Sequence, residues 1–316
     1  MKLKFYATAL LALTLAGCNH DEMDNPLADG PVPLGVTAGI SSVATRITTD
    51  GKVPAFATGD KINVVADGTS AYQYPLNADN KWEAVDNKPY YFQSRDDVSF
   101  RAWYAVTTVT VENNSISIDT KTQTVRDGWN DHDILVTPEV SAGIKTGTTV
   151  SFTCDNAFRH IMSQVAFKFV KGEGITDLDL LTGYTLKGIK TKVGFHTLTC
   201  ELTPEETTAD LPISFEELSP DKKPSSTEYT AAPIILVPQT FANNETNLEI
   251  TYNKQTYKAT LKTPNDGWEA GYSYTYTVTI RNSGLEIGDA TIVGWDTPLN
   301  DGTFKGDVDV DLDNEQ

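Results

Sequence analysis

The sequence predicts an all-β protein built from antiparallel β-sandwiches, and three observations support this fold class. Apolar and polar residues alternate with a period of two in many short segments, most clearly from Tyr272 to Ile280. Asp-Gly pairs, which favour turns, recur between these segments, at 50–51, 67–68, 127–128, 266–267 and 301–302. No stretch keeps the 3.6-residue apolar period of a helix. Many short strands separated by frequent turns are typical of sandwiches.

Eight segments rich in β-branched and aromatic residues carry the strand pattern. They are Lys61 to Ala66, Val98 to Val106, Ser115 to Ile118, Thr149 to Cys154, Gln164 to Val170, Leu248 to Tyr252, Gln255 to Leu261 and Tyr272 to Ile280. Asn253 and Lys254 alone separate two of these segments and predict a tight hairpin. The segment from Leu211 to Tyr229 contains three prolines, so we expect a long polar loop with room for a short helical turn.

A domain boundary is expected between Pro138 and Thr148, where serine, glycine and threonine separate two strand-rich blocks. We place an N-terminal sandwich at 47–146 and a C-terminal sandwich at 147–303, both of ordinary domain size. Residues 304–316 then form a C-terminal tail.

The composition excludes several classes of function. The formal net charge of the 316 residues is −18, and binding nucleic acid requires a basic face that releases counterions. The histidines form no HExxH pair, and the chain has no P-loop, GxSxG or SxxK motif. We therefore expect no enzyme activity, no cofactor and no metal.

His132 and His160 are expected to lie in different environments. Around His132, a strand would place the flanking carboxylates of Asp131 and Asp133 on the face opposite to the imidazole, so a solvated strand entry is favoured over a metal site. His160 follows an apolar position and is expected to be a hydrogen-bonded interior histidine.

The N-terminal segment predicts export. Lys2 and Lys4 precede an apolar run at 7–16 that is too short to cross a bilayer, which needs ~20 residues. It ends in Leu15-Ala16-Gly17-Cys18, which resembles a lipobox, so 1–17 is interpreted as a lipoprotein signal peptide with Cys18 lipidated. An ordinary signal peptide followed by a chance cysteine is the alternative.

Cys154 and Cys200 remain, each among apolar neighbours at strand spacing. They either form a disulfide in an oxidising compartment or act as two small buried hydrophobic residues. The sequence does not set their separation, so both alternatives stay open.

Several motifs in a fixed order then carry a family resemblance. They are the lipobox with Cys18, Phe56-Ala57-Thr58-Gly59-Asp60-Lys61-Ile62, Phe158-Arg159-His160 leading into Val165-Ala166-Phe167, Val237-Pro238-Gln239, Trp268-Glu269-Ala270-Gly271-Tyr272-Ser273-Tyr274 and Ile292-Val293-Gly294-Trp295. Together they resemble the fimbrillin family of the Bacteroidetes, the type V pilins and their accessory subunits. Phe56, where tryptophan is commoner, and Trp103-Tyr104-Ala105-Val106, in place of aromatic-x-proline, depart from that pattern at packing positions.

The resemblance implies two tandem transthyretin-like sandwiches and a structural subunit of a surface fimbria that supports adhesion. It also implies an outer-membrane lipoprotein precursor that is held to lipid through Cys18 and is cut by an arginine-specific surface protease. Arg46, followed by Ile47, lies where that cut is expected. Residues 18–46 would then be a tether and a propeptide strand. For Arg46, an exposed loop arginine in an uncut tip or anchor subunit is the alternative.

The residues themselves support strand exchange. Leu34, Val36, Ala38 and Ile40 alternate, so this segment can fill a sheet edge, and its loss would expose unpaired backbone groups. A neighbour's residues near 304–312 are a candidate donor strand, because alternating apolar side chains can replace the lost ones by strand addition. These side chains are Val308, Val310 and Leu312. A frayed acidic tail is the alternative. Such a head-to-tail contact does not close and would build a filament from fimbrial subunits.

A second function class stays open. A glycan-binding, tip or anchor lipoprotein that does not polymerise would hold a host or bacterial surface ligand, with Trp82, Trp103 and Trp129 stacking on sugars. Tryptophans fit core packing equally well. A hydrolase is disfavoured because no nucleophile pattern is present.

Overall fold

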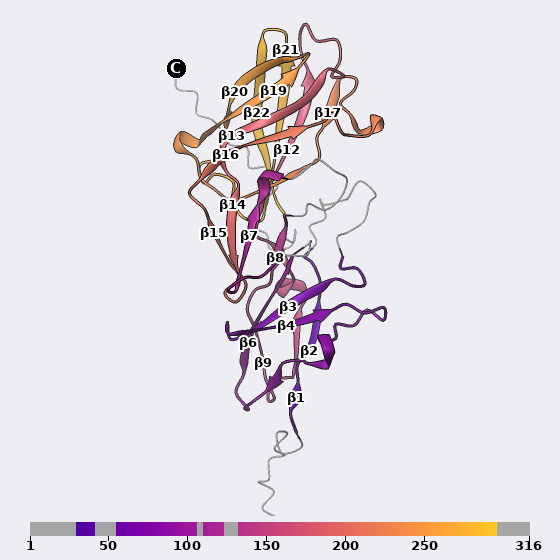
Figure 1. Ribbon diagram of the computed structural model, residues 1–316, viewed down its shortest axis with the longest axis vertical. Coiled ribbons are helices and arrows are strands. Elements are labelled where there is room, and N and C mark those ends of the chain that lie inside the picture. Colours follow the sequence, from indigo (N-terminus) through magenta and orange to yellow (C-terminus); the bar gives the residue numbers. More distant parts are fainter. Residues whose placement is uncertain (1–29, 42–54, 106–109, 123–131, 296–316) are drawn as a thin grey trace, which may run out of the picture.

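The computed structural model describes residues 30–41, 55–105, 110–122 and 132–295. Within these ranges the fold is all-β, and the only helical elements are single 3₁₀ turns. The molecule is elongated, with two groups of strands stacked along its long axis, which we call the N-terminal and C-terminal lobes (Figure 1). The 3₁₀ turns are η1 (Val85–Asn87), η2 (Thr120–Thr122), η3 (Cys154–Asn156), η4 (Pro220–Lys222) and η5 (Ala242–Asn244).

The N-terminal lobe is built on a six-stranded antiparallel sheet in the order β11-β8-β6-β3-β4, with β9 paired to β6. The strands of this lobe, including those outside the six-stranded sheet, are β1 (Val32–Pro33), β2 (Gly35–Ala38), β3 (Lys61–Ala66), β4 (Ser70–Pro75), β5 (Tyr91–Phe92), β6 (Val98–Ala105), β8 (Ile134–Val136), β9 (Val140–Ala142), β10 (Thr149–Phe152) and β11 (Arg159–His160). One face of this sheet buries Val64, Tyr74 and Phe100 against Phe92 and Phe152 in a common core.

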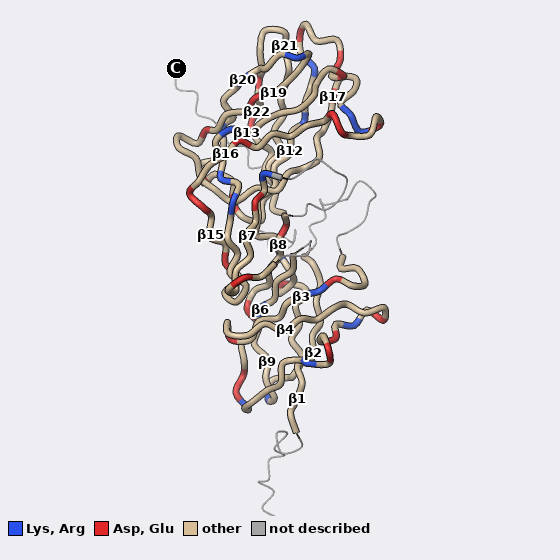
Figure 2. Tube along the Cα trace, in the orientation of Figure 1, with Lys and Arg blue, Asp and Glu red and all other residues tan. Residues whose placement is uncertain are grey.

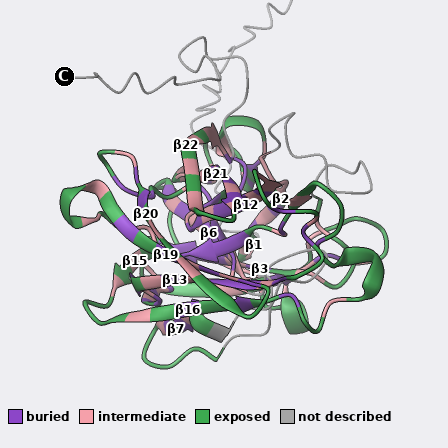
Figure 3. Ribbon diagram, turned by 90° about the horizontal axis from the view of Figure 1, so that it is seen from above, coloured by how far each residue is buried: buried purple, intermediate pink, exposed green. Residues whose placement is uncertain are grey.

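The C-terminal lobe consists of two sheets that share one core. The first has the order β17-β12-β21-β22 with β18 on β12, and the second has the order β16-β13-β19-β20. The strands are β12 (Ser163–Lys171), β13 (Leu181–Lys190), β16 (Thr208–Ser214), β17 (Glu228–Thr230), β18 (Ile234–Leu236), β19 (Glu245–Tyr252), β20 (Gln255–Lys262), β21 (Tyr272–Arg281) and β22 (Gly284–Gly294). Pairing is antiparallel except between β12 and β21. Seen along the long axis, buried residues gather towards the middle of the molecule, and exposed residues lie mainly around its edge (Figure 3).

The alternation in β21 has the predicted effect. Tyr274, Tyr276, Val278 and Ile280 are each at most 1% exposed, and they pack in the core between the two sheets. Trp268 lies in the same core and donates its indole N–H to the Tyr276 hydroxyl at 3.1 Å. The even positions of this strand therefore supply a large part of the apolar surface that joins the sheets.

A further, three-stranded sheet lies between the lobes. It joins β7 (Ser115–Asp119) to β14 (Lys192–His196), which also pairs with β15 (Glu201–Pro204). A core beside this sheet contains Trp103 and Ile134 of the N-terminal lobe, Phe195 of β14, and Ile235 and Trp295 of the C-terminal lobe. The two lobes therefore share buried apolar surface rather than meeting only through a linker.

The predicted strands are found close to their expected positions, and the predicted hairpin between β19 and β20 is confirmed. Tyr252 pairs with Gln255, and both turn residues have positive φ, 48° for Asn253 and 61° for Lys254. These angles are those of a type I′ turn, whose twist matches that of the flanking strands. The polar loop after Leu211 instead begins with the end of β16 and contains the single turn η4.

Charge is distributed over both lobes, with Asp and Glu outnumbering Lys and Arg 43 to 25 along the sequence (Figure 2). On the outer face of the second C-terminal sheet, Lys187 pairs with Asp210 at 2.5 Å, and Lys258 pairs with Glu249 at 2.8 Å. Lys187 also lies 3.8 Å from Glu249, so one chain of ion pairs crosses all four strands of this sheet. In the described ranges no helix has the length and hydropathy needed to cross a lipid bilayer.

Candidate functional site

The N-terminal strand segment, residues 32–41, is held in the N-terminal lobe by backbone hydrogen bonds to two different strands. β1 runs antiparallel to β5, and the Leu34 N–H donates to Tyr90 O at 2.9 Å. The segment then crosses over, and β2 runs parallel to β10 with Gly35 opposite Thr149. The Gly39 N–H donates to Phe152 O at 2.9 Å. The segment thus pairs along its whole described length.

The side chains of this segment complete the core of the N-terminal lobe. Leu34 is 4% exposed and Val36 is 8% exposed, and both belong to the same cluster as Phe92, Phe100 and Phe152. Ala38 and Ile40, the next two positions of the alternation, are half-buried and pack against that cluster. Burying Leu34 and Val36 contributes roughly 1.5–3 kcal/mol for each side chain.

Gly35 stands where the segment changes from β5 to β10. A Cβ atom at this position would lie 2.7 Å from Thr149 Oγ1, so a larger residue would require the Thr149 side chain to move. The glycine lies within the alternating run, and its close packing could have been foreseen as a local exception to the pattern.

The end of the segment is fixed by Phe158. Ile40 forms a parallel bridge with Phe158, the Phe158 N–H donates to Gly39 O at 3.0 Å, and the Ser41 N–H donates to Phe158 O at 2.9 Å. Beyond residues 42–54 the described chain resumes, and the Phe56 ring lies 5.3 Å from the Phe158 ring. Ser41 and Phe56, on the two sides of residues 42–54, therefore both contact Phe158. Arg46 and Ile47, the predicted processing site, lie outside the described residues.

The remaining assembly candidates also lie outside the described ranges. These are Cys18, predicted to carry the lipid, and Val308, Val310 and Leu312, predicted to form the donor strand. The last described residue is Trp295, which is 3% exposed and lies in the core between the lobes.

His160 is buried, as predicted, and its environment is specific. Its Nδ1 lies 2.6 Å from Asp133 Oδ2, and both side chains are 1% exposed. The His160 ring stacks on Trp295 with a centroid separation of 3.9 Å and an interplanar angle of 3°. The prediction of a solvated strand entry is wrong for Asp133, because this carboxylate is buried in the interior against the His160 imidazole.

The two described cysteines do not form a disulfide. Cys154 is an exposed free thiol in η3, where its φ is +53°, and not on the strand face predicted for it. Cys200 is 8% exposed in the core between the lobes, and burial raises the pKa of its thiol to about 12. The disulfide alternative is therefore corrected: one thiol faces solvent and the other is enclosed between the lobes.

The tryptophans proposed as sugar platforms are placed differently from that prediction. Trp103 is 4% exposed in the core between the lobes, with its ring 5.6 Å from that of Phe195. Trp82 is half-buried and packs edge-on against Phe56 at 5.1 Å. Trp129 lies outside the described ranges. Of the three, Trp103 is not available to a ligand.

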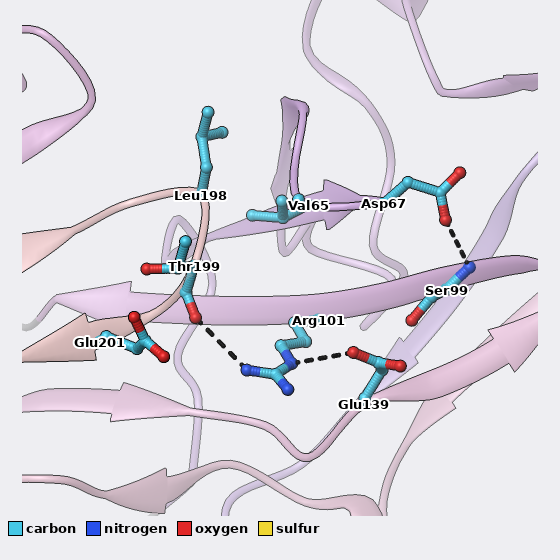
Figure 4. Close-up of a pocket in the computed structure, with 9 residues that line it drawn as sticks. Val65, Asp67, Ser99, Arg101, Glu139, Leu198, Thr199 and Glu201 are labelled. Atoms are coloured by element: carbon cyan, nitrogen blue, oxygen red, sulfur yellow. Dashed lines mark hydrogen bonds and ion pairs between the residues drawn. The ribbon is translucent and has the colours of Figure 1, made fainter.

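A cavity of about 390 Å³ opens between the lobes, beside β6 and β15 (Figure 4). Arg101 supplies the basic side chain of its lining, and it is already engaged: Nη1 donates to Thr199 O at 3.3 Å and Nε lies 3.3 Å from Glu139 Oε2. The lining also contains Ser99, whose backbone N–H donates to Asp67 Oδ1 at 2.9 Å. Among the described residues no cluster of three His, Cys, Asp or Glu side chains could hold a metal ion.

The fold and the N-terminal strand segment together describe a class of protein. It is an elongated β-protein in which an N-terminal strand completes a core made by residues further along the chain. Residues 45–295 match the family model described as Fimbrillin-like, which spans most of the chain. The protein belongs to the fimbrillin-like family, and the resemblance seen in the sequence is confirmed. The match begins after the N-terminal strand segment. No curated protein matches this chain.

Two solved structures share the fold. One is described as a candidate cell adhesion protein from Bacteroides ovatus, with 22% identity and a TM-score of 0.62 over 84% of this chain and 98% of that one. The other carries the same description and comes from Bacteroides uniformis, with 21% identity and a TM-score of 0.60 over 84% of this chain and 100% of that one. At this identity the likeness shows a common fold.

Proposed function

We propose that this protein is a structural subunit of a surface fimbria that assembles by exchange of its N-terminal strand segment. The observation that carries this proposal is that residues 32–41 complete the core of the N-terminal lobe, although they precede the matched family region and the candidate cut after Arg46. Family membership supports a fimbrial role and location at the cell surface. The finer fold interpretation, two tandem transthyretin-like sandwiches at 47–146 and 147–303, is part of this proposal.

Loss of the segment would create an acceptor groove with defined chemistry. The backbone of β10 would lose its parallel partner, and Phe92, Val150 and Phe152 would lose the side chains that cover them. An unpaired strand edge next to exposed aromatic rings favours addition of another strand. The same groove would therefore accept an alternating apolar segment from a neighbouring subunit.

The C-terminal segment offers such a strand by sequence and by reach. Val308, Val310 and Leu312 repeat the two-residue spacing of Leu34 and Val36. If extended, residues 296–316 would span roughly 70 Å, enough to leave one lobe and enter another subunit. Because donor and acceptor are different segments of the chain, the contact is head-to-tail, and its repetition gives an open filament.

Precursor processing completes the proposal. Lipidation at Cys18 would hold the subunit at the outer membrane, and an arginine-specific protease would cut after Arg46. The cut separates the acylated tether from the folded lobes, so one event would release both the anchor and the strand. Other fimbrial subunits are the expected partners.

The experiment is digestion of the purified full chain with an arginine-specific protease, followed by intact mass, N-terminal sequencing and gel analysis without boiling. We expect a chain that begins at Ile47 and a ladder of oligomers. The Arg46→Lys variant keeps the charge but removes the cleavage preference, and it should remain monomeric. A chain that is cut at Ile47 yet stays monomeric would contradict assembly by strand exchange.

The donor assignment has its own test. Val310→Asp should abolish the oligomer ladder after cleavage, because a charge on the inward face cannot enter an apolar groove. Asp309→Asn, on the neighbouring outward position, is the matched control and should assemble normally. Equal assembly by both variants would exclude this segment as the donor.

A second candidate function, glycan binding, is favoured by one observation in the C-terminal lobe. A cavity of about 550 Å³ between β20 and β22 is lined by Tyr272 together with amides and carboxylates, including Asn243, Asn265, Asp266 and Glu269. Aromatic rings and such polar groups suit sugar faces and hydroxyls. Glycan-array binding that is lost in Tyr272→Ala but kept in Tyr257→Ala would support it, and no binding by the intact protein would exclude it.

A further inference from the structure

The short segment Phe158–Met162, which we call the bridging segment, contacts both regions that strand exchange would use. On one side, Phe158 exchanges two backbone hydrogen bonds with the end of the N-terminal strand segment, at Gly39 O and the Ser41 N–H. Phe158 is fully buried, so these bonds are shielded from water. The position of the bridging segment therefore depends directly on whether residues 39–41 are seated.

On the other side, the same segment holds the base of the C-terminal region. His160 stacks on Trp295, and Met162 O accepts the Gly271 N–H at 2.9 Å. Gly271 O in turn accepts the Trp295 N–H at 2.6 Å. Trp295 is thus attached to the bridging segment by its ring through His160 and by its backbone through Gly271.

The bridging segment has little freedom to adjust to only one of these two regions. His160 Nδ1 lies 2.6 Å from Asp133 Oδ2, and Met162 is 0% exposed. β11 also pairs with β8, so the sheet of the N-terminal lobe sets its direction. Packed interiors respond to the loss of a neighbour by changing to another arrangement rather than by gradual deformation.

We propose that the seated N-terminal strand segment and the docked Trp295 stabilise each other through the bridging segment Phe158–Met162. Removal of residues 32–41 then loosens the packing of Trp295, the last described residue, in the same subunit. This inference rests on the proposed function and adds a regulatory step to it. Opening of the acceptor groove would in this way be transmitted to the core between the lobes, where Trp295 lies.

Coupling between two sites is reciprocal, which gives the proposal two independent tests. Weakening the contact at Ser41 must loosen Trp295, and weakening the contact at Trp295 must loosen residues 39–41. Both can be read in the full, uncut chain by hydrogen exchange of the amides named above, because each has a defined acceptor.

The first test compares Ser41→Pro with Ser41→Ala. Proline removes the N–H that bonds to Phe158 O, whereas alanine keeps it and controls for loss of the serine side chain. We expect exchange at Gly271 and Trp295 to be about tenfold faster in Ser41→Pro than in Ser41→Ala, within the usual range of coupling between sites. Amides of β3 and of β19, which lie in the two lobes away from the bridging segment, should keep their protection in both variants.

The second test compares Trp295→Ala with Leu285→Ala. Leu285 lies at the other end of β22 and packs against the core of the C-terminal lobe, so it controls for general weakening of this strand. We expect faster exchange at Gly39 and faster protease cleavage after Arg46 in Trp295→Ala alone. In the combined Ser41→Pro and Trp295→Ala variant, the increase in hydrogen-exchange rate should be smaller than the product of the increases in the two single variants.

The outcomes separate this inference from the proposed function. If Ser41→Pro speeds exchange at Gly39 but leaves Gly271 and Trp295 as in Ser41→Ala, the coupling is wrong, whether or not the chain polymerises. If Ser41→Pro unfolds the N-terminal lobe, seen as loss of protection in β3, Trp295→Ala alone decides by its effect on Gly39. If coupling is found but the chain cut at Ile47 stays monomeric, the coupling stands and strand exchange fails.

Discussion

At the scale of single residues, burial gives the two described thiols opposite reactivity. Cys154 faces solvent in η3, whereas Cys200 is enclosed between the lobes and burial raises the pKa of its thiol to about 12. The thiolate is the reactive form, so a raised pKa together with enclosure makes Cys200 inert at neutral pH.

Alkylation with iodoacetamide at pH 8 should therefore modify Cys154 in the native protein and leave Cys200 unmodified. Peptide mass spectrometry distinguishes the two sites, and it also separates both from Cys18. In denaturant both should react, which shows that the difference comes from the fold. Rapid native modification of Cys200 would mean that the lobes separate in solution.

A second residue-scale prediction concerns the buried hydrogen bond between Trp268 and Tyr276. Tyr276→Phe leaves the indole N–H of Trp268 without its acceptor, so the free energy of unfolding should fall by ~1–3 kcal/mol. Tyr257→Phe, which removes a hydroxyl bonded to Gln255 at the surface, is the control and should change it by less than about 0.5 kcal/mol. Urea unfolding of both variants provides the comparison, and equal losses would contradict this role for Tyr276.

The sequence predicted the burial of some side chains correctly and of others wrongly, for physical reasons. The burial of Tyr274 and Tyr276 follows from alternation, which is a local property. Asp133 directly precedes β8 and contacts His160 of β11, and only tertiary packing reveals that this carboxylate is buried. An aspartate usually indicates exposure, so the general rule gave the wrong expectation here.

At the scale of elements, the N-terminal strand segment should contribute strongly to stability through one face. Leu34→Ala should lower the free energy of unfolding of the intact chain by about 2–4 kcal/mol, because Leu34 is 4% exposed and its removal leaves a cavity. Thr37→Ala, on the outward face of the same strand, should cost below about 1 kcal/mol. Chemical denaturation of the two variants measures the difference, and similar losses would mean that the segment does not form part of the core.

Element prediction succeeded for strongly alternating strands, such as β12 and β21, and missed strands with a less regular pattern. β13 and β22 were not predicted, since both contain internal glycines and both shift register against a neighbour. Such irregular strands are stabilised by their partners on the sheet more than by their own composition. The parallel pairing of β2 with β10 is likewise a tertiary feature.

At the scale of the whole molecule, buried acids that stay protonated should limit stability in alkali. Burial raises the pKa of Cys200 from 9.0 and of Tyr74 and Tyr274 from 10.0, in each case to about 12. The unfolded chain releases these protons at lower pH than the native chain. The stabilisation is therefore complete below about pH 9 and is lost as pH rises towards 12.

Urea unfolding at pH 8, 10 and 11 should accordingly show a falling free energy of unfolding across this window. Cys200→Ala removes one of the groups, so its stability should decline less steeply with pH than that of the parent chain. A flat profile between pH 9 and 11 would contradict the burial of these groups.

Whole-molecule organisation was the least accessible to sequence reasoning. The division at 146 and 147 remains a proposal, and strands pair across it: β7 joins β14, while β10 joins β2. The core between the lobes collects Trp103, Phe195 and Trp295 from widely separated positions. No local pattern marks such residues as neighbours, because each is equally suited to the core of its own lobe.

The sheet that β7 forms with β14, together with the core beside it, has a mechanical consequence. Because several chain segments and a shared apolar core connect the lobes, a pulling force along the long axis is borne by many contacts at once. Each subunit should then behave as a single stiff rod without an internal hinge. In a fimbria built from such rods, bending would be confined to the joints between subunits, and the spacing of those joints would set the flexibility of the fibre.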